Sequence, residues 1–460
     1  MPQGTPGAAE AGAQAAGRGD GRSGYGMMDR TTATPAGPGR NTSTRGAELT
    51  LISTQTGTQP ADLGDVRTTN LAVVLRHVRA NAPCSRADIA AATGLNKATV
   101  SSLVADLIDR RLVRETGLTE NRIGRPATNL VIDGEPYAAL GIEVSADQLT
   151  AVAVDLGGTR LLSWRRAFDA QAATADEAVA AIATLAGRAT GRVRALDRGL
   201  LGLTVAVPGL VDDAGVVRLA TGLGWHDLPL AARLRAALRD PGYDLTVEND
   251  ANLAALAEHR EGRYAGTANL VHLTGGAGIG AGVVADHRLL RGGRGFAGEI
   301  GHVRLDPAGP ACACGRRGCL EALAGIPALI RLALPDAADE GPVGDFAPEI
   351  ERIRARARQG EPSTLDALTA TGRYLGHAVS LLASLLNPEV VLLGGYYAIL
   401  AEWLLPSATA ELVARTAAPD AGGCQLAAGT LGPGAAATGA AATTLAHVDA
   451  GRLPHLRTAG

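Results

Sequence analysis

The first regular pattern of apolar and polar positions starts at Thr68. From there apolar residues recur at i, i+3, i+4 and i+7, which predicts an amphipathic helix; they are Leu71, Val74, Leu75 and Val78. Ser85 precedes Asp88 by three residues, a capping-box spacing that predicts the start of a second helix. That helix should end at the Gly94 turn, and Asn96 is placed to cap a third helix.

The third helix has one apolar face and one face of small polar side chains. Its buried positions are predicted to be Val100, Leu103, Val104, Leu107 and Ile108. Residues 112–116 and 127–132 then predict two strands of a wing. Together these elements predict a winged helix-turn-helix over residues 66–132 that binds double-stranded operator DNA, although a small helical packing domain is the alternative. The predicted DNA contacts are Lys97, Thr99, Ser101, Ser102 and, in the wing, Arg125.

Charge separates this module from the rest of the chain. Residues 66–130 carry ten Lys and Arg against five Asp and Glu, whereas the whole chain has a net charge of -3. A basic module on an acidic body indicates that only the module meets a polyanion. Residues 1–65 are rich in Gly, Ala, Thr, Ser and Pro and predict a disordered tail. Neither a membrane span nor a signal peptide is predicted, so we expect a cytoplasmic protein without membrane partners.

Strand-like and helix-like stretches alternate beyond Pro136. Strands are predicted over 138–144, 149–155 and 160–168, followed by a helix over 174–189 and a strand from 199. Such alternation is typical of an α/β fold.

Three motifs carry a resemblance to a known family. They are Glu248-Asn-Asp-Ala-Asn252, Gly298-Glu-Ile-Gly-His302 and Cys312-Ala-Cys-Gly-Arg-Arg-Gly-Cys-Leu-Glu321. With them the chain, from about Thr68 to its end, resembles the ROK family of sugar kinases and repressors, in the branch with an N-terminal winged helix-turn-helix. The resemblance implies a two-lobed, actin-like sugar-kinase domain of the ribonuclease H-like type over residues 133–460.

One motif suggests a kinase. Kinases resembling this family hold ATP phosphates with an Asp-x-Gly-Gly-Thr turn, and residues 155–159 read Asp-Leu-Gly-Gly-Thr. In the implied fold, however, the phosphate turn joins the first and second strands, and the 155–159 turn joins the second and third. The equivalent turn is therefore 143–148, which has no glycine and contains Asp147. A second loop, 276–280, has Ala277 where such kinases carry Thr. We predict that the 155–159 turn is an ordinary hairpin turn and that kinase activity is lost.

The sugar pocket is carried over from the resemblance. In related kinases the residue matching Asp250 is the general base, and the residue before it fixes a neighbouring hydroxyl. Gly209 and Thr221 are weaker candidates by position. The alternative is that Glu248 and Asp250 merely cap a helix. The predicted sugar contacts are Asn249, Asp250, Glu299, His302 and Glu321.

A zinc site is predicted within residues 298–321. His302, Cys312, Cys314 and Cys319 supply one imidazole and three thiolates, a tetrahedral set for Zn²⁺. Four protein ligands make the site closed and structural, and the metal would orient His302 towards the sugar. The alternative is three free cysteines in a glycine-rich loop.

These features together predict a sugar-responsive transcriptional regulator, a repressor of carbohydrate-utilisation genes without kinase activity. A homodimer or homotetramer that reads palindromic DNA in response to a small sugar effector is expected. The alternative is an ATP-dependent sugar kinase, or a bifunctional kinase and regulator, with Asp250 as general base. A regulator without a sugar ligand is a third possibility.

Overall fold

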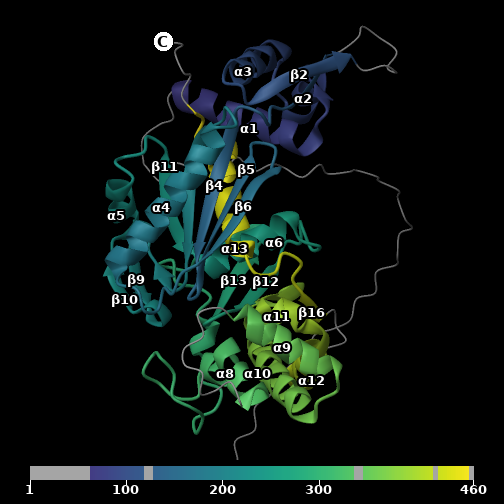
Figure 1. The fold of residues 1–460 in the computed structure, drawn as a ribbon. Coiled ribbons are helices and arrows are strands. Elements are labelled where there is room, and N and C mark those ends of the chain that lie inside the picture. Colours follow the sequence, from purple (N-terminus) through teal and green to yellow (C-terminus); the bar gives the residue numbers. More distant parts are fainter. Residues whose placement is uncertain (1–62, 119–127, 336–345, 418–422, 455–460) are drawn as a thin grey trace, which may run out of the picture. The chain divides into compact units, whose positions relative to one another are not determined.

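The computed structural model describes residues 63–118, 128–335, 346–417 and 423–454. Over these ranges the chain forms a winged helix followed by two α/β lobes (Figure 1). None of the described helices combines the length and the apolar composition needed to cross a membrane.

The caps predicted for the N-terminal module are present. Asp88 N donates to Ser85 Oγ at 3.2 Å, and Ser85 N donates to the Asp88 carboxylate at 3.0 Å, which completes a capping box. Asn96 Oδ1 accepts a hydrogen bond from Thr99 N at 2.8 Å. The helices of the module are α1 (Leu63–Asn81), α2 (Arg86–Thr93) and α3 (Lys97–Asp109).

The first helix begins at Leu63, five residues before the predicted Thr68. The module also contains a three-stranded sheet in the order β1-β3-β2. Strand β1 was not predicted, because two residues are too few to show an alternation of apolar and polar positions. The strands are β1 (Cys84–Ser85), β2 (Val113–Leu118) and β3 (Thr128–Ile132). All the predicted apolar positions of α1 are buried, as are those of α3 except Ile108, which is half-buried.

The first lobe is a five-stranded sheet in the order β11-β7-β4-β5-β6. The strand pairs β4–β5 and β5–β6 are antiparallel, whereas β4–β7 and β7–β11 are parallel. The strands are β4 (Tyr137–Val144), β5 (Gln148–Asp155), β6 (Arg160–Ala167), β7 (Gly199–Val207) and β11 (Asp244–Asn249). Two helices, α4 (Ala175–Arg194) and α5 (Leu230–Ala237), and a small sheet of β8 (Leu210–Val211), β9 (Val217–Ala220) and β10 (Trp225–Leu228) complete the lobe.

The strand order confirms how the two candidate turns are placed. Residues 145–147 join the first and second strands of the antiparallel meander, and residues 156–159 join the second and third. Within the later turn, Asp155 Oδ1 accepts from Thr159 N at 2.8 Å and Asp155 O accepts from Gly158 N at 3.0 Å. The Asp-Leu-Gly-Gly-Thr motif is therefore a hairpin turn closed by its own aspartate.

The second lobe is a five-stranded sheet in the order β14-β13-β12-β15-β16, with a helical layer against it. The strands are β12 (Leu270–Gly275), β13 (Ile279–Ala285), β14 (Arg288–Leu289), β15 (Val390–Gly395) and β16 (Gln425–Ala428). The helices of this lobe are α6 (Asp250–Glu261), α7 (Leu320–Ala324), α8 (Ile326–Ala333), α9 (Ala347–Arg358), α10 (Pro362–Leu386), α11 (Tyr396–Ile399) and α12 (Ala401–Arg415), with a short 3-10 turn at Ile300–His302. The last helix, α13 (Ala435–Asp449), packs between α6 and the sheet of the first lobe, which also contains a 3-10 turn at Thr221–Leu223.

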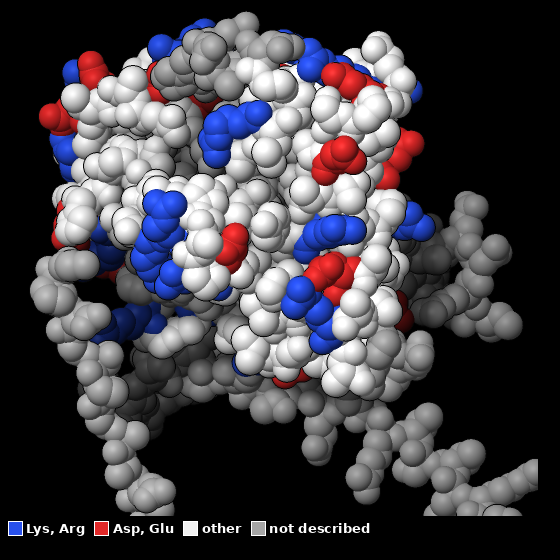
Figure 2. Space-filling view, turned by 90° about the horizontal axis from the view of Figure 1, so that it is seen from below, with Lys and Arg blue, Asp and Glu red and all other residues white. Residues whose placement is uncertain are grey.

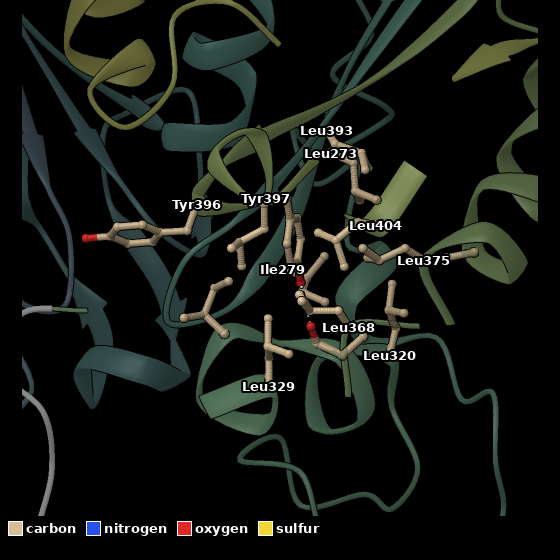
Figure 3. Close-up of a cluster of buried hydrophobic side chains, with 14 of the residues drawn as sticks. Leu273, Ile279, Leu320, Leu329, Leu368, Leu375, Leu393, Tyr396, Tyr397 and Leu404 are labelled. Atoms are coloured by element: carbon tan, nitrogen blue, oxygen red, sulfur yellow. Dashed lines mark hydrogen bonds between the residues drawn. The ribbon is translucent and has the colours of Figure 1, made fainter. Parts of the chain in front are cut away.

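Tyr397 lies at the centre of the apolar core of this lobe (Figure 3). Its ring is fully buried against Gly275, where a Cβ atom would come within 2.3 Å of it, and its hydroxyl donates to Ala324 O at 2.8 Å. A buried Tyr needs such a partner, since leaving its hydroxyl unpaired would cost about 1–3 kcal/mol. The contact fixes the glycine loop that starts at Gly275 against α7.

Helix α13 packs on α6 with almost no side chain between them. A Cβ atom on Gly439 of α13 would lie 1.9 Å from Leu253 O of α6. On the other flank of α13, a Cβ atom on Gly141 of β4 would lie 2.1 Å from Ala437 O. Because both obstacles are backbone atoms, neither can move without shifting an element.

Gly439→Ala is therefore expected to lower the free energy of unfolding by about 2 kcal/mol, because the added methyl group forces α6 and α13 apart. Gly187→Ala is the control: Gly187 lies on the exposed face of α4 with nothing near its Cβ position, and alanine there should stabilise by about 0.7 kcal/mol. Urea unfolding followed by circular dichroism measures both. Equal stability of Gly439→Ala and the unmodified protein would contradict the packing argument.

Candidate functional site

The polar face of α3 is available to a partner. Lys97, Ser101 and Ser102 are exposed and Thr99 is half-buried. Ser101 Oγ donates to Lys97 O at 2.9 Å, and Ser102 Oγ accepts from Arg67 of α1 at 3.5 Å. The four predicted DNA contacts on α3 are thus all at least partly accessible, whereas the predicted wing contact, Arg125, lies outside the described residues.

The junction of β11 and α6 holds Asn249 and Asp250. Asn249 is the N-cap of α6, since its Oδ1 accepts from Asn252 N at 3.0 Å, and its Nδ2 donates to Gly209 O at 2.9 Å. Asp250 follows as the first helical residue and accepts from Ala251 N at 2.8 Å. Burial raises the pKa of Asp250 to about 6, against the lowering effect of these backbone hydrogen bonds. Asn249 thus caps α6, as the capping alternative expects for this junction. Beside the cap, Asp250 provides a carboxyl group with a raised pKa.

The remaining predicted pocket residues come from the segment after β14. Burial raises the pKa of Glu299, and the charges of Asp250 and Glu321 add to that rise while His302 opposes it. Glu321, on α7, accepts from Ile279 N in the glycine loop at 3.2 Å. Glu299 is therefore within electrostatic reach of Asp250, His302 and Glu321. Thr221 makes no hydrogen bond to these residues within the described ranges.

The predicted metal ligands form a compact cluster. The ligand atoms of His302, Cys312, Cys314 and Cys319 all lie within 4.8 Å of one another. The Sγ atoms of Cys314 and Cys319 are 3.7 Å apart, and Cys312 Sγ is 3.7 Å from His302 Nδ1. Two thiolates on one tetrahedral Zn²⁺, each at about 2.3 Å, are separated by about 3.8 Å. The cluster therefore has the composition and size of a site that holds a metal ion.

Two acidic residues near Asp250 were not predicted as site residues. Glu143 is the penultimate residue of β4, and burial together with the charge of Asp250 raises its pKa to about 7. Glu248 forms an ion pair with Arg291 and accepts from Asn252 Nδ2 at 3.1 Å. In the sequence both glutamates look like ordinary strand residues. Only the pairing of β4, β7 and β11 in the fold shows that they lie in one row of the sheet near the site.

The β4–β5 turn is bound to the second lobe. Asp147 is 2% exposed, and its Oδ2 accepts from Phe346 N and from Tyr396 Oη, both at 3.4 Å. Ser145 Oγ donates to Oδ1 of the same carboxylate at 2.7 Å. Figure 3 shows the Tyr396 hydroxyl pointing away from the apolar core that surrounds Tyr397. A cavity of about 320 Å³ remains beside this turn, lined by Asp147, Gln148, Arg165, Ala167, Ala347, Tyr396, Ile399 and Pro433.

Comparison with known proteins gives matches to two family models and relatives that are similar over most of the chain. A model of the ROK family matches residues 139–447, and a model of the MarR family matches residues 72–120. The chain is 29% identical over 387 residues to the xylose repressor of Bacillus spizizenii, covering 84% of this chain and 97% of that protein.

Solved structures agree in fold. A ROK family transcriptional regulator described as a homolog of the Escherichia coli Mlc protein superposes with a TM-score of 0.72 at 27% identity, covering 84% of this chain and 98% of that one. A ROK family glucokinase from Streptomyces griseus, solved with glucose and AMPPNP, gives a TM-score of 0.58 at 28% identity, covering 66% and 98%. These likenesses confirm a winged helix on an actin-like, two-lobed α/β domain. Because the family model matches more than half of its length, the chain belongs to the ROK family.

Proposed function

We propose that the chain is a sugar-responsive transcriptional regulator, a repressor of carbohydrate-utilisation genes that acts in the cytoplasm without kinase activity. The observation that carries this proposal is Asp147. Its buried carboxylate, held by both lobes, occupies the turn at which a nucleotide phosphate would need glycine and open backbone N–H groups. A fixed negative charge there repels phosphate, while the carboxyl groups around Asp250 remain together.

The charge distribution supports the winged helix as the DNA-binding surface. Residues 66–130 are the basic part of the sequence, and α3 presents Lys97 and small polar side chains. On the face shown in Figure 2, blue and red atoms of the described residues lie scattered among white ones, without one large field of a single sign. We propose a homodimer or homotetramer that places two recognition helices on palindromic operator DNA.

The sugar pocket is proposed to comprise Asn249, Asp250, Glu299, His302 and Glu321. Sugar hydroxyl groups donate and accept together, so carboxylates, an amide and an imidazole suit them. Zn²⁺ bound by His302, Cys312, Cys314 and Cys319 would have a structural role, because all four positions of the tetrahedron belong to the protein. It would fix the backbone between Glu299 and Glu321, the two acidic residues at the ends of this loop.

A thermal-shift screen against D-xylose, D-glucose and other common sugars is expected to raise the Tm with one of them and to show no shift with Mg-ATP. Asp250→Asn should weaken binding of that sugar at least tenfold, about 1.4 kcal/mol, whereas the exposed Asp213→Asn leaves it unchanged. A shift with Mg-ATP, or sugar-dependent ADP release, would instead support the kinase.

Lys97→Ala is expected to weaken binding to the promoter fragment of the chain's own gene at least tenfold. If Lys97 neutralises one phosphate, the slope of log K against log salt concentration should also fall by about 0.9. Fluorescence anisotropy at several salt concentrations measures both, with the exposed Arg166→Ala of β6 as the control. Equal affinities of Lys97→Ala and the unmodified protein would place the DNA surface elsewhere.

Metal analysis of the purified protein is expected to find one zinc ion per chain, and a strong chelator should lower the Tm and the sugar affinity together. Cys319→Ser, at a fully buried ligand, should lose the metal, whereas Cys424→Ser should keep it. Full sugar affinity in a zinc-free protein would refute the structural role.

A further inference from the structure

Glu143 lies between the proposed sugar pocket and the C-terminal helix. In the parallel part of the first sheet, Glu143 of β4 is paired with Ala206 of β7, and Ala206 is paired with Glu248 of β11. The three residues form one row across neighbouring strands, about 4.8 Å apart from strand to strand. Asp250 begins the helix that follows β11, so Glu143 and Asp250 meet at the same edge of the sheet.

The Glu143 carboxyl group caps α13. Its Oε2 accepts a hydrogen bond at 3.1 Å from the backbone N–H of Ala437, the third residue of the helix. The N-cap position of α13 is Gly434, which has no side chain to do this. A carboxylate at the N-terminus of a helix is favourable both as a hydrogen-bond acceptor and towards the helix dipole. The stability of the first turn of α13 therefore depends on the charge of Glu143.

Charged groups on the neighbouring elements determine how far Glu143 is ionised. Burial and the charge of Asp250 raise the pKa of Glu143 to about 7, and Asp147 adds a smaller rise. Arg165 of β6 and the Ala437 hydrogen bond act in the opposite direction. A ligand that bonds to Asp250 thus changes the field at Glu143, at a pH where Glu143 is close to half ionised.

The other end of α13 contacts the winged helix. Arg79 of α1 forms an ion pair of 2.9 Å with Asp449, in the last turn of α13, and also donates to Leu156 O at 2.7 Å. Just beyond α13, Pro454 O accepts from Arg110, the C-cap residue of α3, at 2.9 Å. With 15 residues, α13 spans about 22 Å between the pocket and these contacts.

We propose that Glu143 is the positioning residue through which a sugar at Asp250 acts on α13, and through α13 on the orientation of α1 and α3. The inference rests on the proposed function, because it assigns the regulation of the same pocket. A sugar alters DNA affinity only if it binds the two orientations of the winged helix unequally. The hydrogen bond that Ala437 N donates to Glu143 supplies that difference, because it joins the pocket to the first turn of the helix that carries the change.

The test measures coupling, defined as the ratio of DNA Kd with and without saturating sugar, for the full-length protein. The probes are D-xylose and D-glucose, and the DNA is the promoter fragment. Glu143→Gln keeps the size of the side chain but fixes it in an uncharged form. It is expected to bind sugar and DNA separately within threefold of the unmodified protein while the coupling falls at least fivefold.

Asp449→Asn tests the other end of α13 without touching the pocket. It should leave the sugar Kd unchanged and reduce the coupling at least twofold, and it keeps the proposal testable if Glu143→Gln folds poorly. Glu402→Gln, an exposed residue of α12, should change neither quantity. Unchanged coupling in a folded Glu143→Gln, or in Asp449→Asn where Glu143→Gln does not fold, would overturn the proposal.

A second readout separates positioning from simple structural support. The folded-state pKa of Glu143 is above its ordinary value of 4.5, so the folded protein holds the extra proton and loses stability as the pH rises from about 4.5 to about 7. The Tm of the unmodified protein should therefore fall over this interval by more than that of Glu143→Gln. Its coupling should likewise change between pH 6 and pH 8, and this change should shrink in the variant.

The outcomes distinguish this inference from the proposed function. If the unmodified protein binds no sugar or no DNA, the proposed function fails. If it binds both and the sugar changes DNA affinity equally in Glu143→Gln, only the relay fails. If Glu143→Gln loses sugar binding more than tenfold, Glu143 is a direct sugar contact, and the positioning role is refuted.

Discussion

The close approach of α6 to its neighbours is the constraint on which the site depends. A Cβ atom on Gly439 of α13 would lie 1.9 Å from Leu253 O, and one on Gly282 of β13 would lie 2.2 Å from Ala251 O. Backbone therefore touches backbone on both flanks of α6. This contact fixes Asp250, at the start of α6, relative to the glycine loop of the second lobe and to the first turn of α13. Larger residues at either glycine would move the pocket as well as the core.

The proposed pocket contains more acidic side chains than basic side chains paired with them. Glu143, Asp250 and Glu299 all have raised pKa values because they are buried near one another. Arg291 is paired with Glu248, and Arg165 lies at the edge of the neighbouring cavity. Carboxyl groups in this state gain from a neutral ligand that donates several hydrogen bonds. This charge suits the proposed sugar, whereas the proposed opposition to a nucleotide phosphate comes from Asp147 in the β4–β5 turn.

Local signals in the sequence predicted much of this arrangement. The capping box at Ser85, the cap at Asn96 and the strand count that separated the 155–159 turn from the true β4–β5 turn are all features of short segments. Glu143 and Asp147 were read only as a turn unsuited to phosphate. Their partners, Ala437 and Tyr396, lie about 250 to 300 residues away, a separation that no periodicity encodes. The two-residue strand β1 was missed because pairing with β3, and not its own sequence, makes it a strand.

The contact between α13 and the winged helix combines two kinds of interaction with different consequences. Arg79 and Asp449 are partly exposed, so their ion pair contributes about 1 kcal/mol, enough for roughly a fivefold change in an equilibrium. The apolar core of the winged helix, however, continues into α13 through Leu445 and Val448. Burial of such side chains contributes about 2 kcal/mol each and is not directional. In the relay proposed above, the apolar contact would keep the winged helix attached, while the ion pair and the capped first turn of α13 would select its orientation. Sugar binding would then shift DNA affinity by reorienting the module without releasing it.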